Sequence, residues 1–146
     1  MLTRRDWTLM VISLAECQGL SPVQLQKILF LLGKKLGDKL GNDYYQFIPY
    51  HYGPFCADIY NDIADLSNEG YVAVTRTPPF ERATYFITPK GVKRAQQLLG
   101  ECDEEIATTI KRLVNEILPL SFWQLINKIY QEYPDYKRNS VFQEQP

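Results

Sequence analysis

The amino-acid sequence predicts a mainly α-helical domain of the α+β class with one small β-hairpin. Apolar residues recur at the helical spacing of three and four positions along most of the chain. The period changes to the two-residue alternation of strands over residues 71–88. With 146 residues the chain has the size of one domain, so we expect residues 1–146 to fold as a single unit.

The first 41 residues predict two amphipathic helices. The first spans about Asp6 to Gln18 and stops at Gly19. The second begins with Ser21 as its N-cap and with Pro22 in the first helical position, where proline is favoured. Its apolar stripe places four lysines away from the buried face: Lys27, Lys34, Lys35 and Lys39.

An aromatic segment, YYQFIPYHYGPF at residues 44–55, predicts a short strand that runs into a tight turn. We expect His51 to be a structural, hydrogen-bonding residue of this turn. Gly53 permits a backbone conformation that other residues avoid, and Pro54 fixes φ for the start of a third helix. Gly70 ends that helix.

Residues 71–88 predict a hairpin, because two strand-like segments flank a loop that Pro78 and Pro79 keep out of a helix. Three further helices follow, and they begin near Thr88, Asp103 and Ser121. A helix, a hairpin and another helix in this order are typical of a winged-helix domain. We therefore expect three parts: a winged-helix-like core over residues 1–100, a C-terminal helical extension over 101–138 and a frayed tail over 139–146.

The net charge of −1 conceals an uneven distribution of charge along the chain. Residues 42–70 contain five acidic residues and no basic one, and the helix before the hairpin carries four of the acids: Asp58, Asp62, Asp65 and Glu69. In a DNA-binding winged helix this helix usually enters the major groove, where these carboxylates would face phosphates without a neighbouring cation. The acidic helix therefore favours a protein partner with a basic surface over duplex DNA.

DNA binding is the alternative, because the segment that follows the acidic helix is basic. Residues 71–100 carry five basic residues against one acidic residue. A DNA-binding regulator would use the two arginines of the hairpin and four basic residues of the neighbouring helices: Arg76, Arg82, Lys34, Lys35, Lys90 and Arg94. A DNA affinity that falls steeply with salt would identify this alternative.

The sequence contains no recognisable catalytic or metal-binding pattern. His51 is the single histidine, and the three cysteines lack the spacing of metal ligands. We therefore expect no catalytic residue, no metal and no cofactor, and an enzyme is the least favoured interpretation. No window of about 18 apolar residues occurs, so we expect a soluble cytoplasmic protein that does not enter a membrane.

Two stretches resemble a known family. LQKILFLLGKK, residues 25–35, and YHYGPFCADIYNDIADLSNEGYV, residues 50–72, are similar to the Panacea domain, the family of the SocA-like antitoxins. LINKIYQEYPDYKRNS, residues 125–140, resembles the end of the related YwgA-like bacterial proteins. The resemblance implies a mainly helical, winged-helix-like fold in a prokaryotic or phage protein. It also implies a partner protein, which is either neutralised as a toxin or delivered to a protease.

We therefore expect a non-enzymatic protein-binding module of the antitoxin or adaptor type, whose partner is a toxin or a protease substrate. Tyrosines of the aromatic segment that stay exposed would anchor the interface, because tyrosine combines a large contact area with a polar tip. The predicted interface joins these tyrosines to the acidic helix and consists of Tyr50, Tyr52, Asp58, Asp62, Asp65 and Glu69.

Overall fold

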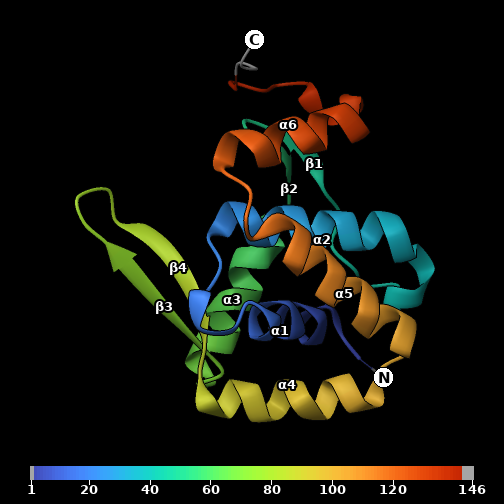
Figure 1. Ribbon diagram of the computed structural model, residues 1–146, viewed down its shortest axis with the longest axis vertical. Helices are drawn as coiled ribbons and strands as arrows, with labels where there is room; N and C mark the ends of the chain where they lie inside the picture. Colours follow the sequence, from blue (N-terminus) through green and yellow to red (C-terminus); the bar gives the residue numbers. More distant parts are fainter. Residues whose placement is uncertain (1, 143–146) are drawn as a thin grey trace.

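A computed structural model describes residues 2–142 and shows the mainly α-helical fold with a small hairpin that the sequence predicts (Figure 1). Within this range there are six α-helices and two separate antiparallel sheets of two strands each. The helices are α1 (Arg4–Leu14), α2 (Pro22–Leu36), α3 (Asp58–Asn68), α4 (Pro89–Glu101), α5 (Glu104–Ile117) and α6 (Phe122–Glu132). The strands are β1 (Ile48–Tyr50), β2 (Gly53–Phe55), β3 (Val72–Thr77) and β4 (Arg82–Ile87).

Side-chain caps set the start of most helices. The Ser21 hydroxyl accepts a hydrogen bond from the backbone N–H of Gln24, whose own side chain accepts one from the Ser21 N–H, as the sequence predicts for α2. Thr88 caps α4 in a similar way by accepting from the N–H of Gly91. The first helix starts earlier than expected, at Arg4, because Thr3 forms a capping box with Asp6.

The prediction that Pro54 opens the third helix is wrong. Pro54 lies instead in strand β2, opposite Pro49 of β1, and α3 begins only at Asp58. The chain reverses at residues 51–52, and Gly53, the first residue of β2, leaves this turn with a φ of +95°, a region that favours glycine. A proline that can open a helix can equally occupy a short strand, because both tolerate its fixed φ and its missing N–H.

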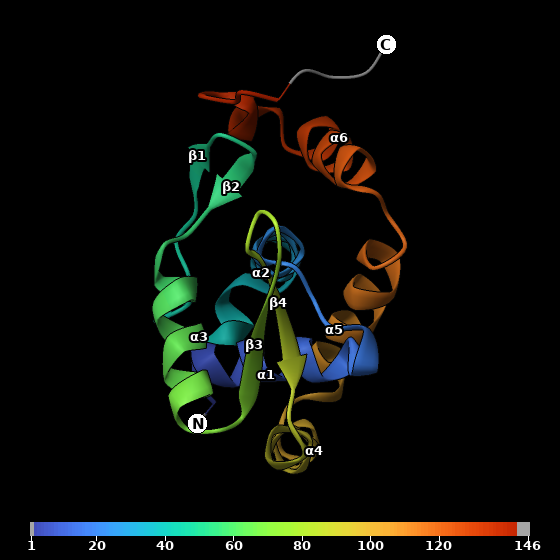
Figure 2. The ribbon, with the colours of Figure 1, turned by 90° about the vertical axis from the view of Figure 1, so that its left-hand side faces the viewer.

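Helix α2 runs through the middle of the molecule, with α1 and α4 on one side and the β1–β2 hairpin and α6 on the other (Figures 1 and 2). Eight consecutive residues of this helix, 25–32, are all buried. The expected exposure of Lys27 is therefore wrong, because the β1–β2 hairpin covers the side of α2 that the stripe pattern leaves outside. Helix α5, from the predicted C-terminal extension, packs against α1 and α2 and so contributes to the same core.

The strands β3 and β4 form the wing, which projects from the body of the molecule (Figure 1). A third segment joins its base, because Leu20, just before α2, exchanges two backbone hydrogen bonds of 2.8 and 3.0 Å with Tyr85 of β4. Along the chain, α1 is followed by Leu20, which bridges to β4, and then by α2, α3, β3 and β4. The β1–β2 hairpin is inserted between α2 and α3. This insertion adds a second hairpin close to the wing.

Part of the predicted tail, residues 140–142, contacts the β1–β2 turn and α6. The Ser140 hydroxyl lies 2.6 Å from the Tyr130 hydroxyl, and the backbone N–H of Val141 donates to the His51 carbonyl at 2.9 Å. Phe142 is buried and its ring lies 4.7 Å from that of Trp123. Residues 140–142 are thus fixed to the β1–β2 turn and to α6, whereas residues 143–146 of the predicted tail lie outside the described residues.

Candidate functional site

The acidic side of α3 meets the N-terminal end of α1. Arg4 reaches two carboxylates that are one helical turn apart, with its Nη1 3.5 Å from Asp58 Oδ2 and its Nε 3.0 Å from Asp62 Oδ2. Arg5, the next residue of α1, likewise reaches two carboxylates farther along α3. Its Nη1 lies 3.9 Å from Asp65 Oδ2 and 3.1 Å from Glu69 Oε1. The prediction that no cation offsets these acids is therefore wrong. Arg4 and Arg5 belong to a different stretch of sequence, and the fold brings them alongside α3.

Asp62 differs from the other three acids because it is buried. Its side chain is 7% exposed, and the Tyr45 hydroxyl donates to its Oδ2 at 2.6 Å. The Tyr45 hydroxyl also lies 2.7 Å from that of Thr8, which completes a chain of polar contacts between α1 and α3. Burial, together with the hydrogen bond to Asp62, raises the pKa of Tyr45 above its usual value. Asp62 thus joins α1 to α3, and its burial leaves little of the side chain for the interface role that the sequence predicts.

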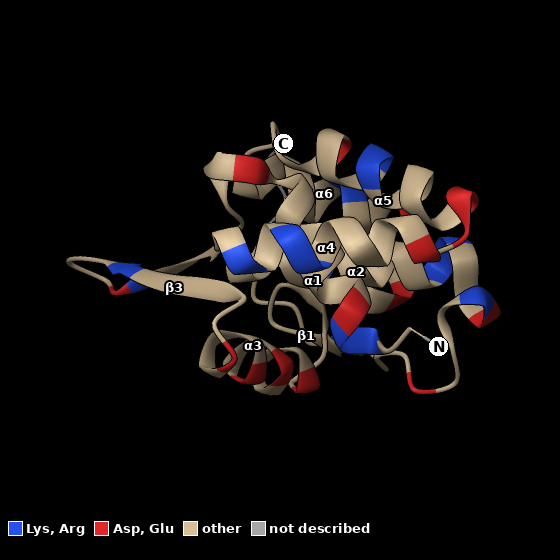
Figure 3. Cartoon of the chain, turned by 90° about the horizontal axis from the view of Figure 1, so that it is seen from below, with Lys and Arg blue, Asp and Glu red and all other residues tan. Residues whose placement is uncertain are grey.

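The remaining acids form a row along one side of α3 (Figure 3). Asp58, Asp65 and Glu69 are each about half exposed, with side-chain exposures of 55%, 55% and 50%. Their ion pairs with α1 are therefore weak, because water screens exposed charges. With Asp62 and the two arginines included, this side has four carboxylates and two cations, so the arginines offset half of its negative charge.

Exposed aromatic side chains gather on another face of the molecule. This aromatic face consists of five residues, each at least 38% exposed: Tyr50, Tyr52, Tyr60, Phe122 and Trp123. They come from the β1–β2 turn, α3 and the start of α6, which surround the N-terminal end of α2 beside the wing (Figure 2). The predicted interface residues Tyr50 and Tyr52 lie here, but the acidic residues predicted with them lie on the other side of α3.

The members of the aromatic face contact one another in two groups. Tyr52 packs edge-to-face on Phe122 at 5.3 Å between ring centroids, and Phe122 packs on Trp123 at 5.8 Å. Tyr50 stacks on Phe55 at 4.8 Å, and Phe55 lies 5.9 Å from Tyr60. Trp123 is not among the residues predicted for the interface, although its position off the apolar stripe of α6 signals exposure.

Three connected hollows lie along the aromatic face. The Lys27 pocket, of 170 Å³, lies under the β1–β2 turn and reaches from Lys27 to Tyr60. The wing pocket, of 650 Å³, lies between Tyr52, Phe122 and Arg82 of the wing. The α3–wing groove, of 630 Å³, runs between α3 and Arg76 of the wing. Tyr52 lines the first two and Tyr60 lines the first and third, so the Lys27 pocket adjoins both of the others.

The charged residues that line these hollows are all cations. They are Lys27, Arg82 and Arg76, one in each hollow, and no aspartate or glutamate is among the lining residues. The acids of α3 face away toward α1 and do not contribute. The aromatic face is therefore apolar and positively charged, which is the opposite of the acidic interface that the sequence predicts.

The two sequence segments that carry the family resemblance meet at this site. The Gln26 side chain accepts from the Cys56 N–H and donates to the Cys56 carbonyl, both at 2.9 Å. The ammonium group of Lys27 donates to the Pro54 carbonyl at 3.1 Å. The LQK segment of α2 thus holds the YGP segment of β2 in place. Burial lowers the pKa of Lys27 to about 8.

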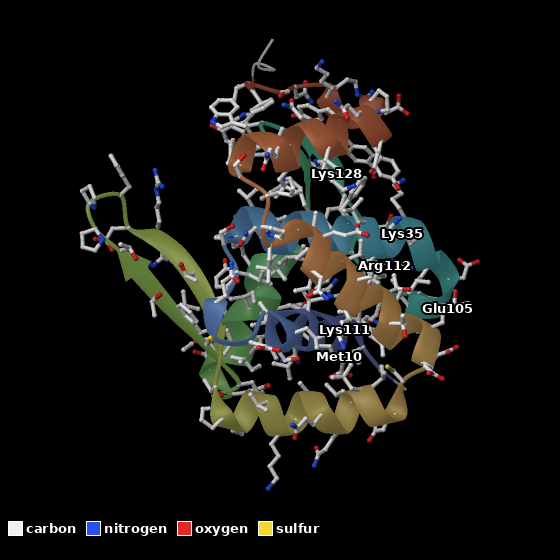
Figure 4. All side chains as sticks on the ribbon, viewed as in Figure 1. Met10, Lys35, Glu105, Lys111, Arg112 and Lys128 are labelled. Carbon is white, nitrogen blue, oxygen red and sulfur yellow. The ribbon has the colours of Figure 1, made fainter. Side chains whose placement is uncertain are left out.

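The residues predicted for DNA binding do not form one surface. Arg76 and Arg82 lie on the wing, whereas Lys34 and Lys35 lie at the opposite end of α2, where Figure 4 labels Lys35. The Lys34 ammonium group lies 5.5 Å from the centre of the Tyr136 ring, which directs it toward the C-terminal segment. The two remaining residues lie on α4 and make local contacts: Lys90 donates to the Glu69 carbonyl and Arg94 to the Gln97 side chain.

His51 lies in the β1–β2 turn, where its ring and its backbone carbonyl both make stabilising contacts. Its ring stacks on that of Tyr50, with 4.3 Å between centroids, and its carbonyl accepts from the Val141 N–H.

Among residues 2–142, no cluster of three or more histidine, cysteine or acidic side chains has the arrangement of a metal site, and no helix is long and apolar enough to cross a membrane. No protein-family model matches the sequence, and no curated protein matches it either.

Proposed function

We propose that this chain is a non-enzymatic protein-binding module of the antitoxin or adaptor type, which holds its partner on the aromatic face. The observation that carries the proposal is the aromatic face itself, with five exposed aromatic residues around three connected hollows. Aromatic residues beside apolar pockets are the usual anchors of protein interfaces, and large exposed apolar patches are rare on proteins that bind nothing.

The charge of the aromatic face determines what kind of partner fits. Arg76 and Arg82 border the hollows, and Lys27 lies within one of them. Complementary charge steers association and excludes wrong partners. We therefore expect the partner to present apolar side chains next to acidic ones, and not the basic surface that the acidic helix suggests.

The antitoxin or adaptor type follows from the resemblance to the Panacea domain. Lys27, Tyr50 and Tyr52 belong to the two segments that carry this resemblance, and all three line the Lys27 pocket. A partner protein encoded next to this chain is the first one to test, because antitoxins act on proteins made together with them.

Co-expression with the product of the adjacent gene tests the proposal. A toxic neighbour should stop growth of the host, and this chain should restore it. We expect Tyr52→Ala and Trp123→Ala to lose rescue, because the loss of an interface aromatic often costs about 2 kcal/mol of binding free energy, or roughly 30-fold in affinity. An adaptor would in addition shorten the half-life of the partner in cells that contain the protease.

Val92→Ala is the matched control for these variants. Val92 is exposed to a similar degree, 38%, but lies on α4 at the opposite end of the molecule (Figure 1). It should keep full rescue. If the aromatic variants bind the neighbouring protein as tightly as the wild type does, the partner does not bind on the aromatic face.

DNA binding is the second candidate function, favoured by the position of Arg76 and Arg82 beside the α3–wing groove and the wing pocket. Two phosphate contacts would give a slope of about −2 in a plot of log affinity against log salt. A gel-shift assay at low salt that shows no complex across different duplex sequences would remove this candidate.

A further inference from the structure

Lys27 is the one lysine among residues 2–142 whose side chain lies inside the protein. It is 3% exposed, and its ammonium group donates to the Pro54 carbonyl at 3.1 Å. No carboxylate of the described chain lies within ion-pair distance of it, whereas the buried Asp62 has Arg4. A buried cation without an anion is costly, so its retention calls for an explanation.

Attachment of α2 to β2 does not explain a charged group at this position. The neighbouring residue Gln26 already makes two hydrogen bonds to Cys56 of the same segment, and it does so with a neutral amide. A second neutral side chain would serve the same purpose without the desolvation of a charge. The charge of Lys27 therefore points to a ligand that the chain itself does not supply.

The Lys27 pocket has a floor and a rim. Lys27 forms the floor, because it is nearly inaccessible, while Tyr50, Tyr52 and Tyr60 are 43–45% exposed and form the rim. The volume of 170 Å³ is below the roughly 300–1,000 Å³ of sites for drug-sized ligands. The pocket therefore has room for one amino-acid side chain.

We propose that the Lys27 pocket receives the carboxylate of an aspartate or glutamate side chain from a partner polypeptide, with the apolar neighbours of that residue in the adjoining wing pocket. This inference rests on the proposed function and specifies the chemistry of the partner. Charge complementarity supports it, because no acidic residue of the described range 2–142 lines either pocket and Arg82 adds a second cation in the wing pocket. The burial of Lys27 beneath the tyrosine rim would shield the ion pair from much of the water, which strengthens it.

A nucleic acid fits this pocket less well. Its phosphates follow one another along the chain, and binding needs a row of cations. The Lys27 pocket offers a single cation at the bottom of a small hollow with an aromatic rim. One carboxylate on a flexible side chain matches that geometry better.

The experiment uses the isolated protein and two blocked peptides, acetyl-Leu-Glu-Leu-amide and its glutamine counterpart. The charge of Lys27 is followed by NMR of its side chain across pH. The glutamate peptide binds only the charged amine, so it should move the titration midpoint of Lys27 upward from about 8 by a unit or more. Its affinity should fall about tenfold per pH unit above the midpoint in the free protein. The glutamine peptide should leave the midpoint unchanged.

Lys27→Met is the decisive variant, because it removes the charge but fills a similar space. With circular dichroism showing that it is folded, it should bind the glutamate and glutamine peptides equally. Tyr52→Ala provides a second test at the rim, and it should weaken the glutamate peptide while Lys27 keeps its position. Equal affinity of the wild-type protein for the two peptides would overturn the proposal.

Two further probes separate the sources of the anion. Inorganic phosphate or acetate that binds as tightly as the glutamate peptide would overturn the proposal in favour of a small-anion site. A Lys27-dependent complex with oligo-dT would overturn it in favour of single-stranded nucleic acid. The peptide assay needs no partner protein, so its outcome is independent of the growth assay. Selective binding of the glutamate peptide without rescue of growth would reject the antitoxin role alone. Rescue of growth without selective binding would reject this inference alone.

Discussion

The acidic side of α3 and the aromatic face both border this helix, yet they differ in whether their buried charge has an ion-pair partner within the chain. On the acidic side four carboxylates meet Arg4 and Arg5, and the buried member, Asp62, has a cation beside it. On the aromatic face no carboxylate of the described residues lines the pocket of the buried cation Lys27. Each acid of the row thus has an arginine within 3.9 Å, whereas Lys27 forms no ion pair with any carboxylate of residues 2–142.

The comparison shows why charge counted along a segment is a poor guide to charge on a surface. Residues 42–70 have a strongly acidic composition, but the arginines that pair with them lie 54–64 positions earlier in the chain. Pairs of this kind cancel over a few ångströms in space and are invisible in a local sum.

The largest effect is expected for the buried acid. Asp62→Ala should lower the free energy of unfolding by about 3 kcal/mol, because it removes the acceptor of Tyr45 and leaves the Arg4 guanidinium without its closest partner. Asp65→Ala, on the same helix but exposed, should change it by less than about 0.5 kcal/mol. Urea unfolding of both variants measures the difference. Equal values would show that the two ion pairs are equivalent.

The unpaired cation should give stability a distinctive pH dependence. The pKa of Lys27 is lowered to about 8 in the folded protein, so between pH 8 and 10.5 the unfolded state binds more protons and stability rises with pH. Relative to Lys27→Met, the wild type should gain about 2 kcal/mol of unfolding free energy between pH 7 and 10. The tyrosines titrate in both proteins and cancel in the difference. A difference that is flat with pH would place the ammonium group in water.

A cation at the edge of the aromatic face should affect binding more than folding. Arg82→Gln is expected to lower the affinity for the partner by about fivefold, mainly through a slower association rate. The effect should disappear at high salt, since Arg82 is exposed. Stopped-flow association at two salt concentrations measures both. An association rate that does not change would mean that the partner does not approach along the wing.

The smallest effect is expected from the acidic side. The triple variant Asp58→Asn, Asp65→Asn, Glu69→Gln removes three exposed charges and should leave partner affinity within about twofold of the wild type. The same equilibrium-binding assay used for Arg82→Gln provides the comparison. A large loss of affinity would restore the acidic helix as part of the interface.

The sequence was a reliable guide where structure depends on neighbouring residues. Ser21 and Thr88 cap their helices as predicted, because a cap satisfies backbone groups only two or three positions away. The wing was also predicted, because its alternation and its two prolines are local signals. Pro54 misled the prediction, since either a helix start or a short strand is compatible with it and the pairing with Pro49 decides.

The candidate site was only partly predictable. Tyr50 and Tyr52 were identified correctly as exposed residues of the aromatic segment. The burial of Lys27 depends on a hairpin that crosses over α2 from a distant part of the chain, and helical periodicity carries no information about such a cover. The pairing of Asp62 with Arg4 could not be predicted for the same reason, since the two residues are 58 positions apart in the sequence.

The attachment of residues 140–142 to the β1–β2 turn has a practical consequence for dissecting the protein. Val141 secures the turn that carries Tyr50 and Tyr52, and Phe142 packs on Trp123. A truncation before residue 140, made to obtain a shorter N-terminal fragment, would thus remove contacts that support the surface under study. The smallest fragment suited to interaction screens or crystallisation with a partner therefore retains α6 and extends through Phe142.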